Sequence, residues 1–232
     1  MKKINLLLIG LVTLLISGCE NDTDKDTNIV TDYDGNTYKF VTIGTQTWMT
    51  ENLKVTHYPN GEKIPLVSDN VIWVALDDND IDKGYCYYNN KSSSEYGVLY
   101  TYAAALNACP TGWHLPSDEE WKTLELYLGM SQSAVDDVAG RGTNEGEKLK
   151  ATSGWFSNGN GTDDFGFSAL PGGHRVASYG TFNNAGISGH WWSATEYDDI
   201  FAWYRSLYYD YDNVNRSIKS KSEGFSVRCL MD

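Results

Sequence analysis

The sequence predicts an α+β protein built from short strands, long loops and two helices. Strand-forming residues are grouped in short runs, of which residues 38–43 (YKFVTI) are the clearest. Apolar and small residues recur at helical spacing most clearly in residues 96–108 and residues 117–128. The composition agrees with this class, because 8 Trp, 16 Tyr and 22 Gly are typical of a chain with many short strands and turns.

The N-terminal part of the domain, residues 29–53, has the features of β structure. Turn-forming residues 34–36 (DGN) come before the strand-forming run. Residues 44–46 (GTQ) then turn the chain into residues 47–50 (TWMT). We therefore expect a β extension on the N-terminal side of the helices.

Two helices are expected in the middle of the chain. The first occupies residues 96–108, where Leu99 and Ala103 lie at helical spacing. The second follows Ser117, which can form a capping box with Glu120 three residues later. Acidic residues fill its first turn, where the helix dipole favours negative charge. An apolar face then continues to a glycine, which is a natural end for a helix.

The C-terminal half predicts less regular structure. From residue 154 onward the chain is rich in Gly, Asn, Asp and aromatic residues, which favours long loops and short strands. A shorter helix is expected near residues 133–138. The last strand is expected at residues 225–230.

The N-terminus has the layout of a secretory signal peptide. Lys2 and Lys3 precede an apolar run over residues 6–16, and small residues follow it. This run is too short to span a bilayer as a helix. Residues 15–19 (LISGC) resemble the bacterial lipobox, in which the Cys is lipidated and becomes the mature N-terminus. We therefore predict a signal peptide over residues 1–18 and lipidation of Cys19, with an ordinary signal peptide and a chance Cys as the alternative.

The segment after Cys19 predicts a tether and a location. Residues 20–28 (ENDTDKDTN) hold no apolar residue, so residues 19–28 are interpreted as a lipidated Cys with an acidic tether. Residues 29–232 then form the domain. We expect an outer-membrane lipoprotein of the cell envelope, and acidic residues after the lipidated Cys resemble signals for surface export. The net charge of −13 argues against nucleic acid and against an anionic membrane surface.

The cysteines allow one disulfide. The chain has Cys19, Cys86, Cys109 and Cys229. If Cys19 carries lipid, three cysteines remain, and an oxidising envelope favours one bridge and one spare thiol. The sequence alone allows three pairings. No two cysteines have CxxC spacing, so a metal site is a weak alternative.

Three separated segments carry a resemblance to a known family. Residues 109–121 read CPTGWHLPSDEEW, residues 166–173 (GFSALPGG) come before residues 190–196 (HWWSATE), and residues 224–229 read GFSVRC. Together with residues 34–53, they resemble the Fibrobacter succinogenes major paralogous domain family, over roughly residues 29–232. That family is common in envelope lipoproteins. It is similar to the C-type-lectin-like fold and to its relative, the formylglycine-generating enzyme fold.

The resemblance implies an architecture and a disulfide. The implied fold is C-type-lectin-like, with two helices, short antiparallel strands and long loops, plus the N-terminal β extension. It also implies a Cys109–Cys229 bridge and adjacent chain ends. Cys86 is then left over, although it could instead take one of the two as its partner.

Catalytic motifs are missing. The sequence has no GxSxG elbow, no HExxH motif and no P-loop. Its four histidines, His57, His114, His174 and His190, have no ligand spacing. An enzyme of the formylglycine-generating type is expected to carry two reactive cysteines in the C-terminal half, where this chain has only Cys229. We therefore predict that the protein is not an enzyme.

Calcium is a possible cofactor, but the sequence lacks the Glu-Pro-Asn, Gln-Pro-Asp and Trp-Asn-Asp motifs of lectins that bind sugar through it. Two oxygen-rich loops, residues 158–164 and 210–213, carry the ligand types that calcium prefers. The alternative is that these are solvated turn residues. The candidate ligands are Asp163, Asp164, Asp210 and Asp212.

Aromatic residues give the stronger binding signal, since nine of the 21 residues from 191 to 211 are aromatic. Ring faces beside Asp and Arg suit stacking on sugar rings. Neighbouring residues in a strand point to opposite faces, so one of Trp191 and Trp192 is expected in the core. A core role for the whole group is the alternative. The candidate ligand-binding residues are Trp192, Trp203, Tyr204, Tyr208, Tyr209, Tyr211 and Arg205.

Together, these observations predict a non-catalytic, lipid-anchored envelope protein that binds a polysaccharide or another surface ligand. The expected partners are the membrane, through the N-terminal lipid, and a glycan or surface protein. The alternative is a structural or adhesive protein–protein module of a surface complex. An enzyme of the formylglycine-generating type is the remote alternative.

Overall fold

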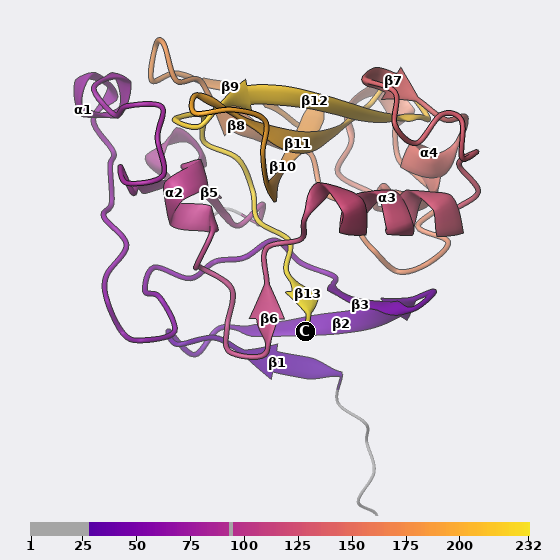
Figure 1. Ribbon diagram of the computed structural model, residues 1–232, viewed down its shortest axis with the longest axis horizontal. Helices are drawn as coiled ribbons and strands as arrows, with labels where there is room; N and C mark the ends of the chain where they lie inside the picture. The colour runs from indigo at the N-terminus through magenta and orange to yellow at the C-terminus, as the bar shows by residue number, and fades with distance from the viewer. Residues whose placement is uncertain (1–27, 93–94) are drawn as a thin grey trace, which may run out of the picture.

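The computed structural model describes residues 28–92 and 95–232 and has a mixed α+β architecture, as predicted (Figure 1). The described residues contain four α-helices, of which one is longer than a few residues, and three sheets. No helix among them has the length and apolar character needed to cross a membrane. The predicted signal peptide (residues 1–18), the lipidation site Cys19 and the tether up to residue 27 lie outside the described residues.

The N-terminal sheet is the expected β extension. It has five strands in the order β1-β2-β3-β13-β6 and curls into a half-barrel. The strands are β1 (Ile29–Thr31), β2 (Thr37–Ile43), β3 (Gln46–Met49), β6 (Trp113–His114) and β13 (Leu230–Met231). The last strand of the described chain therefore lies in the same sheet as the first. The strand expected over residues 225–230 is shorter than predicted and lies later in the chain. Of the expected residues, only Leu230 belongs to β13.

The disulfide Cys109–Cys229 closes this end of the molecule, as the family resemblance implied. It joins the segment before β6 to the segment before β13, with the two Cα atoms 5.9 Å apart. Leu230 pairs with Trp48 on one side and with His114 on the other. Cys86 is free and buried.

A smaller unit lies beside the two large sheets. It consists of α1 (Asn70–Val74), α2 (Tyr102–Ala105), the short helix η1 (Tyr88–Asn90) and a hairpin of β4 (Tyr85–Tyr87) and β5 (Val98–Tyr100). The helix expected over residues 96–108 is therefore wrong in its first half. Residues 98–100 are all buried and pair with β4, so tertiary pairing overrides their helical spacing.

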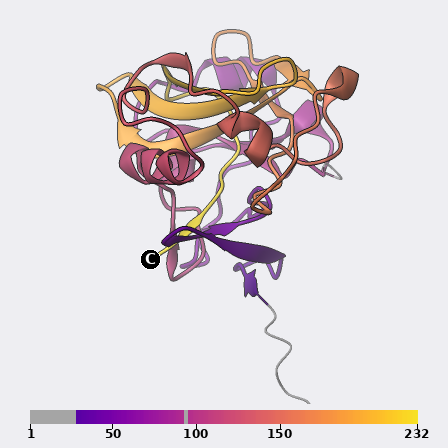
Figure 2. The ribbon, with the colours of Figure 1, turned by 90° about the vertical axis from the view of Figure 1, so that its right-hand side faces the viewer.

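The long helix, α3 (Asp118–Tyr127), has the predicted capping box. The Ser117 hydroxyl accepts a hydrogen bond from the Glu120 backbone N–H (3.3 Å), and the Glu120 carboxylate accepts one from the Ser117 backbone N–H (2.8 Å). The buried residues Trp121 and Leu124 form its apolar face. Figures 1 and 2 place α3 beneath the six-stranded sheet, on the side of the N-terminal sheet.

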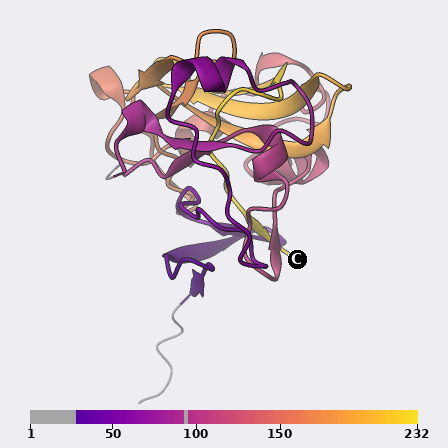
Figure 3. The same ribbon diagram turned by 90° about the vertical axis from the view of Figure 1, so that its left-hand side faces the viewer.

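The six-stranded sheet forms the other end of the molecule, in the order β7-β12-β11-β10-β8-β9 (Figures 2 and 3). Only the β8–β10 pair is parallel. The short helix expected near residues 133–138 is wrong, since these residues form turns that lead into β7. The elements of this half are β7 (Ala139–Arg141), α4 (Glu145–Leu149), η2 (Phe156–Asn158), β8 (Gly172–Arg175), β9 (Phe182–Ala185), β10 (Ser188–Glu196), β11 (Phe201–Tyr208) and β12 (Val214–Ser220).

Candidate ligand-binding surface

Two of the candidate aromatic residues lie in the core. Trp192 on β10 pairs across the sheet with Tyr204 on β11, and both side chains are buried. The Trp192 indole N–H donates to the backbone carbonyl of Tyr100 (2.8 Å), and the Phe225 ring packs against both rings. Neither side chain has a free face for a ligand. The expectation that Trp192 and Tyr204 contact a ligand is therefore corrected: they belong to the core.

Arg205, the expected polar contact, is also buried. Its guanidinium donates to the carboxylates of Asp118 (2.7 Å) and Glu125 (2.6 Å) on α3. Arg141 donates to the Glu125 carboxylate as well, and Arg216 donates to the Asp118 carboxylate. Burial opposes ionisation of Asp118, but the hydrogen bonds and charges of the arginines outweigh it and lower its pKa. Arg205 therefore fastens α3 to the sheet and is unavailable to a ligand.

Trp203 is half-buried and already has a stacking partner. The guanidinium carbon of Arg216 lies 3.6 Å from the centroid of the Trp203 ring. The edge of the exposed Tyr197 contacts the same ring, with the centroids 5.5 Å apart. One ring face of Trp203 is thus covered by a cation of the protein itself.

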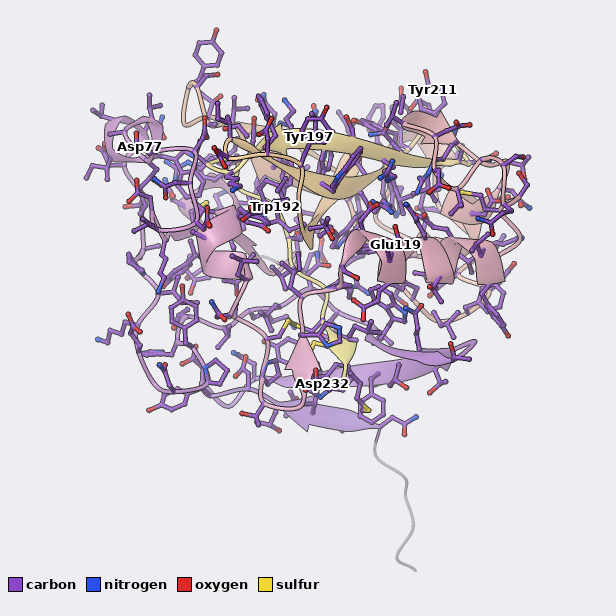
Figure 4. The ribbon with its side chains drawn as sticks, in the orientation of Figure 1. Asp77, Glu119, Trp192, Tyr197, Tyr211 and Asp232 are labelled. Atoms are coloured by element: carbon purple, nitrogen blue, oxygen red, sulfur yellow. A yellow bond between two sulfur atoms is a disulfide. The ribbon has the colours of Figure 1, made fainter. Side chains whose placement is uncertain are left out.

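Several aromatic residues that are exposed or half-buried lie at the turn after β11. Tyr208 and Tyr209 are half-buried, whereas Tyr211 is 57 % exposed. Phe156, from the distant loop that contains η2, is 59 % exposed, and its ring lies 5.4 Å from that of Tyr209. The Tyr208 and Tyr211 rings are 6.3 Å apart. These four residues, here named the aromatic patch, lie at the end of the molecule far from Asp232, as the position of Tyr211 shows in Figure 4.

A buried lysine holds the turn of the aromatic patch. The Lys150 ammonium donates to the backbone carbonyls of Tyr211 (3.0 Å) and Tyr208 (3.3 Å). The loop of Phe156 packs closely against the same turn at Gly159. A Cβ added at Gly159 would lie 2.1 Å from the Tyr209 carbonyl oxygen, which is too close for any side chain. Only glycine allows this approach. The rings are therefore presented by a preorganised backbone rather than by a loose loop.

The four candidate calcium ligands do not gather into one cluster of carboxylates within the described residues. Lys150 already supplies the positive charge at the carbonyls of the turn, and its ammonium lies 3.7 Å from the Asp212 carboxylate. Asp163 accepts hydrogen bonds from the backbone N–H (2.7 Å) and the hydroxyl (2.6 Å) of Ser168. Asp164 and Asp210 are exposed. Within the described part of the chain, no group of three or more His, Cys, Asp or Glu side chains could hold a metal ion.

Two of the four histidines lie side by side in the sheet, with His190 buried and His174 half-buried. The rings of His174 on β8 and His190 on β10 are 4.6 Å apart, and neither Nδ1 atom has a hydrogen-bond partner. His190 Nε2 is 2.8 Å from the Ser188 hydroxyl. Burial, together with the charge of Lys219, lowers the pKa of His174 to about 4. Burial, together with the charges of His174 and Lys219, also lowers the pKa of His190. Both imidazoles are therefore neutral at pH 7.

A cavity lies at the opposite end from the aromatic patch, beside the disulfide. It has a volume of about 520 Å³ and a mixed polar and apolar lining. His114, at its edge, lies between the carboxylates of Asp232 (2.7 Å) and Glu120 (3.0 Å). These contacts join the C-terminus to α3, so we assign His114 a structural role.

The sequence matches the Fibrobacter succinogenes major domain family over residues 41–231. This match runs from β2 to β13 and covers most of the chain, so the chain belongs to that family. No curated protein and no solved structure shows significant similarity to the chain.

Proposed function

Starting from membership of the Fibrobacter succinogenes major domain family, we propose that the protein binds a polysaccharide through the aromatic patch. In this proposal it is a non-catalytic, lipid-anchored protein of the outer membrane. The observation that carries the proposal is the exposure of Phe156 and Tyr211 beside the half-buried Tyr208 and Tyr209. An apolar surface of this kind is stabilised when it is covered by a ligand.

The chemistry of the aromatic patch suits sugars. Phenyl and phenol rings stack on the C–H faces of sugar rings, while Asp210 and Asp212 in the same turn offer acceptors to sugar hydroxyls. A few exposed rings on an open surface bury little area, so we expect weak affinity for each site, with a Kd of roughly 0.1–1 mM. A polymer that engages several anchored copies would gain avidity.

The location of the patch is consistent with a surface role. The described chain begins beside β1, at the opposite end of the molecule from Tyr211 (Figure 4). If Cys19 carries lipid, the tether joins the domain at the end opposite the aromatic patch, which leaves the patch accessible. We further propose that the fold is C-type-lectin-like, on the basis of α2, α3 and the disulfide that brings the last strand back beside them.

Cys86 argues against an enzyme of the formylglycine-generating type. Burial raises the pKa of its thiol to about 12, with Arg175 opposing the shift. Such a thiol supplies almost no thiolate at neutral pH, and the thiolate is the reactive species. The other two cysteines of the described domain are joined in the disulfide.

The test is a binding screen of the mature chain against plant and host glycans, in calcium and in chelator. We expect binding that the double variant Phe156→Ala/Tyr211→Ala abolishes and that chelator leaves unchanged. Tyr127→Ala is the matched control, because Tyr127 is 56 % exposed but lies on α3. Absence of binding to every glycan, or equal loss in the control, would rule out the aromatic patch as a glycan site.

A further inference from the structure

The short helix α1 exposes the residues that a helix normally buries. Of its apolar side chains, only Trp73 is buried. Val71, Ile72 and Val74 are 78 %, 58 % and 45 % exposed, respectively. We name these three residues the α1 ridge. The ridge lies at the far end of the molecule from the N-terminal sheet (Figures 1 and 3).

The α1 ridge is held firmly in place. The carboxylate of Asp69 caps the helix by accepting hydrogen bonds from the backbone N–H groups of Val71 (2.8 Å) and Ile72 (3.1 Å). Trp73 anchors the helix from below, with the guanidinium of the buried Arg175 at 4.3 Å from its ring centroid. The exposed aliphatic side chains therefore stand on an ordered support, which lowers the entropy cost of docking a partner.

A groove runs beside the ridge. It has a volume of about 380 Å³, and Val74, Leu76 and Phe201 form its apolar wall. Glu223 forms part of the polar wall; it is 4 % exposed and its Oε2 atom has no hydrogen-bond partner. The single cation of the groove, Lys219, lies 3.6 Å from the other oxygen. Because Asp78 also lines the groove, its net charge is negative.

Acidic residues are concentrated in the segment that contains α1 and the loop after it. Residues 69–82 contain five Asp and no Lys or Arg. Asp77 lies beside α1 in Figure 4, and Ile81 in the same segment is 78 % exposed. Asp80 is paired with the buried Lys221 at 3.1 Å, so the other acids of the segment carry its net negative charge. An apolar centre with a rim of one sign of charge favours a partner with the opposite rim.

We propose that the α1 ridge and its groove dock a protein segment that presents apolar side chains flanked by Lys or Arg. The apolar side chains cover the ridge, and the basic side chains face the acidic rim and the groove of Glu223. A second copy of this chain is a poor occupant, because pairing two ridges face to face would bring the two acidic rims together. The ridge and the aromatic patch are separate surfaces, since Asp77 and Tyr211 lie on the left and the right of the upper end of the molecule in Figure 4.

The test uses two synthetic helical peptides with the same leucine positions, one with Lys and one with Glu at the polar positions. Each is titrated into the mature chain by fluorescence anisotropy at low and at high salt. We expect the Lys peptide to bind in a salt-sensitive manner and the Glu peptide to bind at least about tenfold more weakly. Equal binding of the two peptides, or no binding of the Lys peptide, would overturn the proposal.

Variants locate the binding surface. Val71→Ser/Ile72→Ser is expected to weaken binding of the Lys peptide at least about tenfold without unfolding the protein, because both side chains are exposed. The matched control is Leu126→Ser/Val138→Ser, which alters two exposed aliphatic residues elsewhere and should leave binding unchanged. Equal affinity of the ridge variant and the wild type would show that the peptide binds elsewhere on an acidic surface. Sedimentation that detects a dimer in the wild type but not in the ridge variant would assign the ridge to a second copy instead.

Discussion

The aromatic residues of β10 and β11 and those of the turn that follows come from one short stretch of sequence, yet they serve different purposes. Trp192 and Tyr204 sit opposite each other in paired strands and fill the core. Tyr209 and Tyr211 lie past the last strand pair and reach the surface. A high density of aromatic residues therefore indicates both core and surface positions in this chain. The residues in paired strands are buried, and those in the turn reach the surface.

The polar partners of the two regions differ in the same way. In the strands, the Trp192 indole N–H and the Arg205 guanidinium are fully used by the protein. In the turn, Lys150 donates to backbone carbonyls and not to the side chains, so the Tyr211 ring stays exposed. Substitutions in the strands should therefore change folding, whereas substitutions in the turn should change binding.

The largest expected effect is the loss of Trp192. Trp192→Ala removes a fully buried indole and one of the two hydrogen bonds that the Tyr100 carbonyl accepts, so we expect the free energy of unfolding to fall by about 3–5 kcal/mol. Urea unfolding measures this change. A loss below about 1 kcal/mol would contradict the assignment of Trp192 to the core. The aromatic residues of the strands and of the turn would then not differ in their contribution to stability.

Arg205 sharpens the comparison because it was the expected polar contact of a ligand. Arg205→Ala leaves the buried carboxylates of Asp118 and Glu125 short of one partner, which costs about 3 kcal/mol or more. We expect lower stability and, in the folded fraction, unchanged glycan affinity. If stability were unchanged and glycan affinity lost, Arg205 would be a ligand contact after all.

Acid should weaken the strand region through its histidine pair. The pKa of His174 in the folded state, about 4, lies below that of the unfolded chain, so its neutral form contributes full stability above pH 6.5. Stability is lost as the pH falls from 6.5 toward 4, by roughly 2 kcal/mol at pH 5 for His174 alone. Unfolding of wild type and His174→Gln at pH 7 and pH 5 checks this. The same pH dependence in both proteins would contradict the prediction.

A smaller effect is expected from the support of the turn. Lys150→Met removes the side-chain donor from the carbonyls of Tyr208 and Tyr211, of which Tyr208 keeps the backbone N–H of Tyr211 as a donor. This costs about 1–3 kcal/mol and frees the turn that presents Tyr211. Glycan affinity should fall although Lys150 itself faces no ligand. Lys148→Met is the control, since this lysine donates to a backbone carbonyl of Leu128, away from the turn. Unchanged glycan affinity in Lys150→Met would show that the turn needs no preorganisation.

The features that could be predicted from the sequence were local or came from the family resemblance. The capping box of Ser117 and Glu120 depends on residues three apart, and the resemblance supplied the Cys109–Cys229 pairing. Residues 98–100 could not be assigned to a strand locally, because their helical spacing is overruled by pairing with β4.

The candidate site was predicted only in part, because its outcome depends on residues far apart in the sequence. Phe156 belongs to the aromatic patch because its ring contacts that of Tyr209, which is far away in the sequence. No local sequence pattern predicts this contact. Arg216 covers Trp203, and Lys150 supplies the charge that a calcium ion would otherwise bring to the turn. Arg216 and Lys150 are cations whose targets are set by the fold.

The most direct test of the account compares folding and binding in one experiment. The mature wild-type chain and its Phe156→Ala/Tyr211→Ala variant would be unfolded in urea and then titrated with the glycan that binds the wild type best. We expect the free energies of unfolding to agree within about 0.5 kcal/mol and the glycan affinity to fall at least about tenfold. Equal glycan affinity, or a loss of stability as large as that of Trp192→Ala, would contradict the claim that the turn presents its rings for binding.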